Sequence, residues 1–212
     1  SAAIQGVDAA EVEIEVQTAG QGDFKFVIVG LPDTSVRESG DRVMNALRSS
    51  SLEAPLLGRT TVNLAPASMR KEGPSFDLPI AIGIAAACSG RQIPRLQHCH
   101  IAGELGLTGE VRPIRGALAL ALEARKQGRK AILLPSTNAA EGAMVEGICA
   151  YPVRSLREAF EFLCGDLELS PMPPGGRPAP PSMNASISQK SKAKKRSSGR
   201  SRLPSPVATT SC

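Results

Sequence analysis

Polar side chains able to take part in chemistry are concentrated between Arg70 and Pro79, where the sequence reads RKEGPSFDLP. The charged and hydroxyl-bearing residues of this stretch are Arg70, Lys71, Glu72, Ser75 and Asp77. A serine hydroxyl is a weak nucleophile until a neighbouring base takes its proton, so Ser75 is a candidate nucleophile that needs a partner. The other four residues form a candidate interaction loop. Its two basic residues are expected to be exposed, where they would either contact phosphate or form a solvated surface.

The same stretch also fits the start of a helix. An apolar run from Ile80 to Ala87 follows it, and Pro79 suits a first helical turn. Ser75 or Asp77 can cap the free N–H groups of that turn. We favour this structural role for Ser75. Asp77 is expected to be a cap or an ion-pair partner, because no second carboxylate stands at a spacing that indicates acid–base catalysis.

Two motifs resemble the proteolytic domain of Lon. The first is Gly73-Pro74-Ser75, and the second, Gly103 to Ile114, reads GELGLTGEVRPI. In Lon the serine of the first motif is the nucleophile, and a lysine four residues beyond the Pro-Ile pair activates it. Leu118 holds that place here, so the resemblance implies a broken Ser-Lys dyad. Glu104 matches a fixed position of the family, and we assign it no role.

A longer series of motifs resembles another family in the same order along the chain. The motifs are Gly6-Val7-Asp8, Val27 to Asp33, Val62 to Pro66, Arg70 to Pro74 and Phe76 to Ala81. On these residues the chain, from Ile4 to about Leu163, is identified as a member of the magnesium-chelatase-like YifB/ComM family. The resemblance implies an N-terminal domain with the Lon-type fold, which is shared with a domain of a small-subunit ribosomal protein. Many members carry Ala or Ser at the Ser75 position, which argues against an obligatory nucleophile.

The resemblance also implies what complete family members do. They carry an ATPase domain of the AAA+ class that uses ATP and Mg²⁺, assemble into rings, and in ComM-type members are credited with branch migration of DNA during natural transformation. The phosphate-binding motif G-x-x-x-x-G-K-[ST] of such a domain does not occur in this sequence. We therefore expect a non-catalytic N-terminal accessory domain with no cofactor of its own, whose partners are further subunits or DNA. The alternatives are a Lon-like serine peptidase that uses Ser75 and a small nucleic-acid-binding module.

Charge is distributed unevenly along the 212 residues. The formal net charge is +5, but eight basic residues and no acidic ones follow Glu168, so the part before this tail carries −3. A basic tail indicates nucleic-acid binding much less than a basic patch on a folded surface does. The tail is rich in Pro, Ser and Lys and has little apolar surface to bury, which predicts disorder.

Cysteine and histidine content indicates neither a disulfide framework nor a metal site. The cysteines are Cys88, Cys99, Cys149, Cys164 and Cys212, and we expect them to be reduced core residues. His98 and His100 flank Cys99, but a zinc site requires four suitable ligands, and the other cysteines stand singly. The sequence has no run of about eighteen apolar residues and no leader of a charged and then apolar type. We expect a soluble, cytoplasmic protein with no membrane partner.

Hydrophobic periodicity predicts strands over 11–16, 24–29, 60–64, 99–105, 107–111, 131–134 and 148–153, and helices over 34–49, 78–89, 117–127, 138–144 and 155–164. The first two strands are expected to pair as a hairpin. The helix over 78–89 is apolar on every side and should be packed between layers. On the helix over 34–49, Val36, Val43 and Leu47 should face the core and Arg42 the solvent. The mixture of elements favours an α/β fold, as a two-layer α+β sandwich.

We expect one Lon-like domain over residues 1–168 and a disordered basic tail over 169–212. The family resemblance stops where the ATPase domain would begin, so a frameshift in the tail is a hypothesis. One choice of codons for Ser186 to Ser198, read two bases later, encodes DFAEVKGQKALE, which resembles the entry to that domain. The nucleotide sequence across the tail tests this hypothesis.

Overall fold

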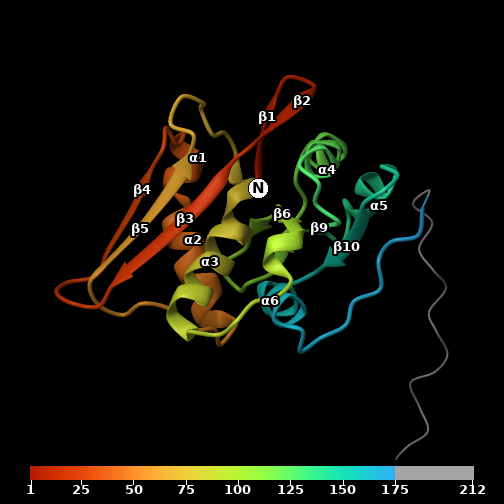
Figure 1. Ribbon diagram of the computed structural model, residues 1–212. Helices are drawn as coiled ribbons and strands as arrows, with labels where there is room; N and C mark the ends of the chain where they lie inside the picture. The colour runs from red at the N-terminus through yellow and green to blue at the C-terminus, as the bar shows by residue number, and fades with distance from the viewer. Residues whose placement is uncertain (175–212) are drawn as a thin grey trace, which may run out of the picture. The chain divides into compact units, whose positions relative to one another are not determined.

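The computed structural model describes residues 1–174, which form a mixed α/β fold with two main sheets (Figure 1). The α/β class predicted from the sequence is confirmed. Most of the tail predicted over 169–212 lies outside the described residues. Residues 169–174 are described and contact the domain, so the domain extends past the predicted boundary at residue 168.

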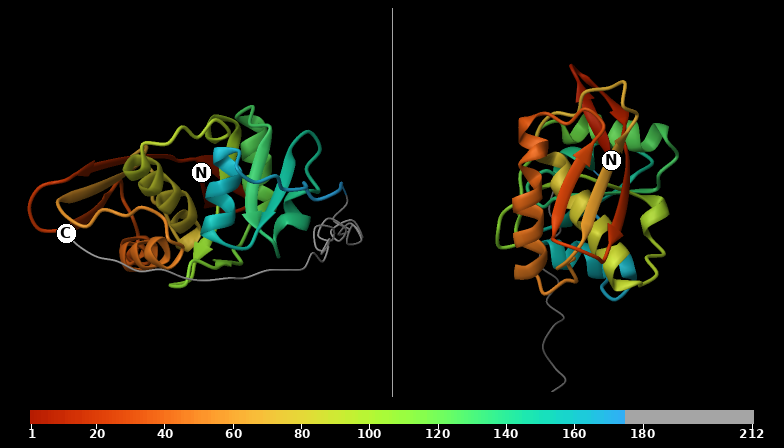
Figure 2. Two further views of the ribbon diagram at one scale, coloured as in Figure 1. Left: turned by 90° about the horizontal axis from the view of Figure 1, so that it is seen from below. Right: turned by 90° about the vertical axis from the view of Figure 1, so that its left-hand side faces the viewer.

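The first sheet has three strands in the order β3 (Glu13–Ala19), β5 (Arg59–Ala65) and β4 (Lys25–Val29). β5 is antiparallel to β3 and parallel to β4. Side chains alternate along β5, so that Thr60, Val62 and Leu64 are buried while the residues between them are partly exposed. Such alternation is expected of a sheet with one solvated face. That face is turned toward the viewer in the right-hand view of Figure 2, and no described helix covers it.

Two helices, α2 (Ser39–Ser49) and α3 (Asp77–Ser89), cover the other face of this sheet, and a single turn, α1 (Thr34–Arg37), precedes them. Close approach of the helices depends on glycines. A Cβ atom at Gly40 would lie 2.8 Å from the ring of Phe26, and one at Gly83 would lie 2.8 Å from Cγ2 of Val16. The two glycines therefore set the spacing between the helices and strands β4 and β3.

The second sheet is parallel, in the order β10 (Cys149–Val153), β9 (Ala131–Pro135) and β6 (Cys99–Ile101). All five residues of β9 are buried, as in a parallel sheet covered on both faces. Ile132 and Leu134 pack in one apolar cluster with α4 (Ala117–Lys126). Leu133 packs in another with α3 and α6 (Leu156–Cys164). The short helix α5 (Ala139–Gly142) connects β9 to β10.

Smaller elements complete the domain. They are the hairpin of β1 (Ala2–Gln5) with β2 (Asp8–Glu11), the hairpin of β7 (Glu104–Leu105) with β8 (Val111–Arg112), and the 3₁₀ turns η1 (Pro74–Phe76) and η2 (Leu96–His98). The β1–β2 hairpin lies against α4 (Figure 1). The loop that carries the predicted site residues joins β5 to η1 and α3.

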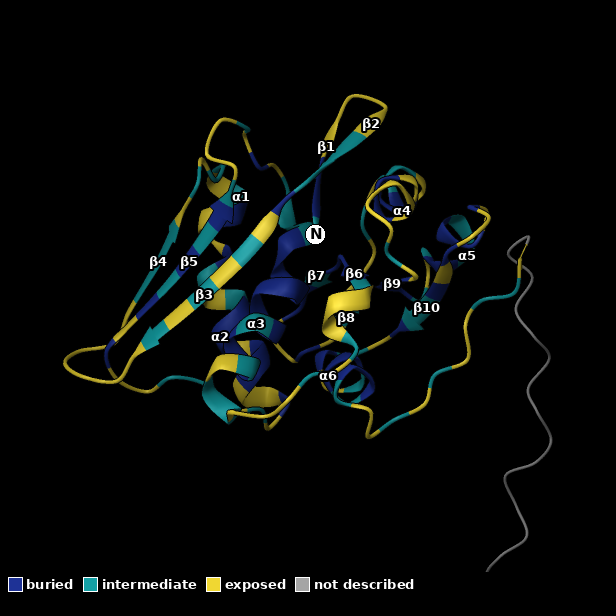
Figure 3. Ribbon diagram, viewed as in Figure 1, coloured by how far each residue is buried: buried dark blue, intermediate teal, exposed yellow. Residues whose placement is uncertain are grey.

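The central helix α3 occupies the position that its sequence predicts. Eight of its side chains, from Asp77 to Ala85, are buried, and it packs on β3, α2 and α6 (Figure 3). A helix that is apolar all round must be covered on all sides. Because α3 is fixed in the core, the loop that enters it is fixed as well.

Several local predictions are wrong in instructive ways. Strands β3 and β4 do not form a hairpin, because β5 pairs between them. The helix predicted over 34–49 is divided at Glu38 into α1 and α2. The strand predicted over 107–111 is mostly the turn that leads into β8. Cys149 is exposed and the other three described cysteines are half-buried, so none is a full core residue.

The close packing of α3 on β3 leads to a prediction about the free energy of unfolding. Gly83→Val should lower the free energy of unfolding by about 2 kcal/mol, because the added methyl groups overlap the stiff side chain of Val16. The matched control is Gly20→Val, at a position where a Cβ meets no atom within 4 Å. Urea denaturation midpoints measure both. Equal midpoints for the two variants would contradict the packing argument.

Candidate functional site

Asp77 is the centre of the polar groups around the loop. It is the first residue of α3, and its side chain is fully buried. Nε of Arg42 donates to Oδ2 at 2.7 Å, and Nη2 of the same guanidinium donates to Oδ1 at 3.1 Å. The hydroxyl of Ser39 also donates to Oδ1, and the backbone N–H of Leu105 donates to Oδ2 at 3.3 Å. Both carboxylate oxygens therefore have two donors each, which is what a buried charge requires.

Arg42 is held in place by more than Asp77. Its Nη2 also donates to the carbonyl of Ser35 at 3.0 Å and approaches the hydroxyl of Ser39 at 3.3 Å. The hydrogen bond to Asp77 raises the pKa of the Arg42 guanidinium above its ordinary value. A bidentate arginine–carboxylate pair has a fixed planar geometry, so this pair locks α2 onto the start of α3. The prediction that Asp77 is an ion-pair partner is confirmed, and the prediction that Arg42 faces solvent is wrong.

Glu104 lies beside this cluster on β7. Its side chain is about one quarter exposed, and Oε1 lies 3.9 Å from Nη1 of Arg112 on the paired strand β8. Arg112 makes a closer ion pair with Glu110, at 2.7 Å. The next residue, Leu105, supplies the N–H that Asp77 accepts. In the described structure Glu104 is therefore a partly exposed residue next to the Asp77 cluster.

Lys71 lies inside the domain, although the sequence predicts it on the exposed loop. Its side chain is fully buried, and its ammonium donates to the carbonyl of Pro66. The backbone of Lys71 pairs with the Leu31–Asp33 turn, which holds the loop against the end of β4. None of the ion pairs within residues 1–174 includes Lys71. Burial lowers the pKa of its ammonium below the ordinary value of 10.5.

Asp33 organises the other side of the loop. Its Oδ1 accepts the N–H of Val36 at 2.8 Å and caps α1. Its Oδ2 accepts the N–H of Gly73 at 3.1 Å. Gly73 has a φ of 81°, a conformation that side-chain-bearing residues rarely adopt. The turn before Ser75 is therefore held by one carboxylate that also starts a helix.

Ser75 lies half-buried in η1, directly before α3. Its carbonyl accepts the N–H of Gly103, but no hydrogen bond of its hydroxyl occurs within the described residues. Neither η1 nor α3 has a side-chain cap, so the prediction that Ser75 or Asp77 caps the helix is wrong. The carboxylate of Asp77 is instead taken up by α2 and β7. Leu118, at the place of the Lon lysine, lies at the start of α4 and is partly exposed.

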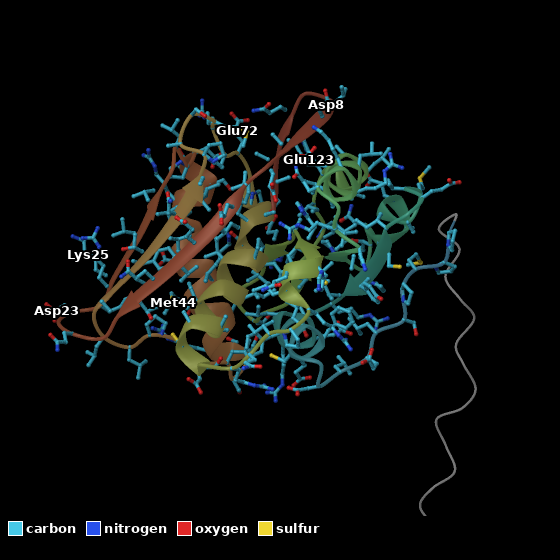
Figure 4. All side chains as sticks on the ribbon, viewed as in Figure 1. Asp8, Asp23, Lys25, Met44, Glu72 and Glu123 are labelled. Carbon is cyan, nitrogen blue, oxygen red and sulfur yellow. The ribbon has the colours of Figure 1, made fainter. Side chains whose placement is uncertain are left out.

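The outer part of the loop carries a solvated ion pair. Nε of Arg70 lies 3.4 Å from Oε1 of Glu72, and both side chains are mostly exposed. Figure 4 shows Glu72 on the loop after β5, at the outside of the domain. Exposed pairs of this kind contribute little to stability. Of the four predicted interaction-loop residues, only Arg70 and Glu72 present charge to solvent.

The two histidines that flank Cys99 lie in different environments. His98 is exposed in η2, whereas His100 is buried on β6, and burial lowers the pKa of its imidazole well below 6.5. Within residues 1–174 no three His, Cys, Asp or Glu side chains are grouped so that they could hold a metal ion. The same residues include no helix long and apolar enough to cross a membrane.

A family model described as subunit ChlI of Mg-chelatase matches residues 12–138. The matched segment includes β3, the loop and α3, and it extends through α4 and β9. The chain belongs to the Mg-chelatase ChlI family. In this family member the segment from residue 139 onward, which includes β10 and α6, lies outside the match but completes the core.

Longer proteins resemble the chain more specifically. It is 40% identical over 169 residues to competence protein ComM of Haemophilus influenzae, a match that covers 80% of this chain and 33% of ComM. It is 39% identical over 160 residues to YifB of Escherichia coli, covering 76% of this chain and 31% of YifB. The chain therefore spans about a third of the length of these curated relatives. The predicted YifB/ComM resemblance is confirmed.

The likeness to Lon is weaker and also partial. The chain is 31% identical over 156 residues to Lon protease 1 of Hydrogenovibrio crunogenus, covering 68% of this chain and 19% of that protease. This similarity supports the Lon-type fold predicted from the Gly-Pro-Ser motif. It does not supply the missing partner of Ser75.

Removal of the buried charge at Asp77 tests the central cluster. Asp77→Asn should lower the free energy of unfolding by about 3 kcal/mol, because it leaves the guanidinium of Arg42 without its charge partner. Asp166→Asn, which breaks the exposed Arg91–Asp166 pair, should cost less than about 1 kcal/mol. Chemical denaturation measures both. A cost for Asp77→Asn as small as that of the control would show that the cluster is not a structural lock.

Lys71 predicts a specific pH dependence. A base whose pKa is lowered on folding binds more protons in the unfolded chain, so stability rises with pH up to the ordinary value of 10.5. The wild-type protein should therefore gain stability relative to Lys71→Met as the pH is raised from 7 toward 10.5. Denaturant midpoints of the pair across this range measure the effect. Lys126→Met, at an exposed lysine, is the control and should show no such trend.

Proposed function

We propose that this chain acts as a non-catalytic accessory domain of the YifB/ComM type, making contacts with other protein subunits or domains. The observation that carries the proposal is the state of the groups around Ser75. Its hydroxyl has no hydrogen-bonded base in the described structure, the ammonium of Lys71 is directed to the carbonyl of Pro66, and Leu118 stands where Lon has lysine. The sequence also lacks a phosphate-binding loop, so ATP hydrolysis is not expected of this chain alone.

We favour binding to protein over binding to DNA as the role of residues 1–174. The part before the basic tail carries a net charge of −3, and burial of Lys71 removes one of the two cations from the loop. Phosphate contacts provide most of the affinity in DNA binding, and they require clustered exposed cations. The name of ComM refers to competence, and we extend that role to this chain only as the setting in which such an accessory domain would work.

A Lon-like peptidase is the second candidate, because the chain is 31% identical to Lon protease 1 over 156 residues, which cover 68% of this chain. In this case Ser75 would need a base from another molecule or another conformation. Its position before the buried helix α3 gives it a rigid setting, but rigidity does not lower the cost of removing the hydroxyl proton.

One experiment separates the two candidates. The purified chain and its Ser75→Ala variant should both fail to cleave fluorogenic peptides or unfolded casein, and their circular dichroism spectra and melting curves should be the same. Thr61→Ala, on the exposed face of the first sheet, is purified and assayed in the same way as a control for contaminating proteases. Cleavage by the wild type that is lost in a folded Ser75→Ala protein would establish the peptidase instead.

DNA binding requires its own measurement, since the tail carries eight basic residues. We expect any binding of labelled duplex DNA to weaken steeply between 50 and 200 mM salt and to weaken further when Lys192, Lys194 and Lys195 are changed to Gln. Binding that survives these changes but is lost in Arg70→Gln would show that the loop is a nucleic-acid surface. Fluorescence anisotropy distinguishes these outcomes.

A further inference from the structure

The last described residues cross the outer edge of the second sheet. After α6 the chain is held by an ion pair of Asp166 with Arg91, at 2.6 Å, and Nη1 of Arg95 donates to the carbonyl of Leu167 at 3.3 Å. Leu169 then packs against the apolar cluster around α3. The segment continues alongside β10, as both Figure 1 and the left-hand view of Figure 2 show.

The outer edge of β10 has few free hydrogen-bonding groups. The N–H of Cys149 donates to the carbonyl of Lys130, and the carbonyl of Val153 accepts the N–H of Ser136. The backbone groups of Cys149 and Val153 therefore face β9, and those of the residues at alternate positions face away from the sheet. These outward residues are Ala150 and Pro152, and Pro152 has no N–H. The edge therefore offers two carbonyls and a single N–H to any chain that lies beside it.

One residue of the crossing segment matches this edge. The N–H of Met172 donates to the carbonyl of Ala150 at 2.7 Å. Pro171 and Pro173 on either side have no N–H, so Met172 provides the only backbone donor of these three residues. The side chain of Met172 is half-buried in the apolar cluster of α4, β9 and β10.

An open groove lies beside the docked segment, at the start of β10. It has a volume of about 630 Å³ and lies between the loop that joins α5 to β10 and residues 171–174. Val145 and Ile148 contribute apolar surface to one wall, and Pro171 and Pro173 contribute to the other. Unbranched methionine adapts well to such an irregular apolar site, and prolines limit the entropy lost when the segment is ordered.

We propose that the edge of β10 is a recognition site for an extended segment with one unbranched apolar side chain between two prolines, and that Pro171-Met172-Pro173 occupies this site in cis. The bond to the carbonyl of Ala150 and the packing of the Met172 side chain hold the last described residues against β10. The docked segment also prevents β10 from pairing with a strand of another molecule, a hazard of any open edge. This inference is independent of the function proposed above.

Hydrogen exchange on the full-length chain tests the docking. Met172→Asp should exchange about tenfold faster than wild type in peptides that cover 149–153 and 169–174, because a charged side chain cannot occupy the apolar site. Met183→Asp makes the same change further along the chain, outside the described residues, and should leave both regions unchanged. Unaltered exchange in Met172→Asp, or equal acceleration in the two variants, would overturn the proposal.

Binding in trans tests recognition. A labelled peptide with the sequence ELSPMPP, residues 168–174, should bind the Met172→Asp protein and not the wild type, whose site on the β10 edge is occupied. The same peptide with Met replaced by Asp should bind neither protein. Fluorescence anisotropy measures all four combinations, and Met172→Ala replaces Met172→Asp if the latter does not fold. Failure of ELSPMPP to bind the Met172→Asp protein, or equal binding to the wild type, would refute recognition of this segment.

Discussion

The buried carboxylate of Asp77 is the constraint on which the loop region depends. A buried carboxylate must accept hydrogen bonds from donors at fixed positions. Here the donors are Arg42 and Ser39 of α2 and the N–H of Leu105 in β7. Asp77 is also the first residue of α3. One side chain thus sets the separation of three elements that are distant in sequence, and the turn that holds Ser75 follows from their positions.

This arrangement gives a structural role to the polar groups of the region that resembles the Lon site. Each polar group near Ser75 has a structural partner: Asp77 has Arg42, Asp33 has the N–H groups of two turns, and Lys71 has the carbonyl of Pro66. A catalytic base must be free to take a proton when substrate arrives. Groups that are already hydrogen-bonded to the loop make it rigid, which agrees with the accessory role proposed above.

Sequence reasoning located most elements but not their long-range partners. Helix α3 and strand β5 were predictable because apolar runs and alternation are local signals. The insertion of β5 between β3 and β4 was not, since pairing of strands so far apart leaves no periodic pattern. Arg42 lies on the polar side of its helix by periodicity, yet it reaches a carboxylate 35 residues later in the chain. Burial of Lys71 depends on the position of one carbonyl, and composition does not encode that position.

Packing places the end of the domain beyond the segment that the family model matches. The match ends at residue 138, but the cluster that buries α3 also contains Val153, Phe160 and Leu163 from β10 and α6. Without these residues, one side of a helix that is apolar all round would face water, at a cost of roughly 25 cal/mol for each Å² exposed. Arg95 then connects α6 to the segment after it, through the carbonyls of Phe162 and Leu167. The folded unit that supports the loop therefore includes the residues that follow α6.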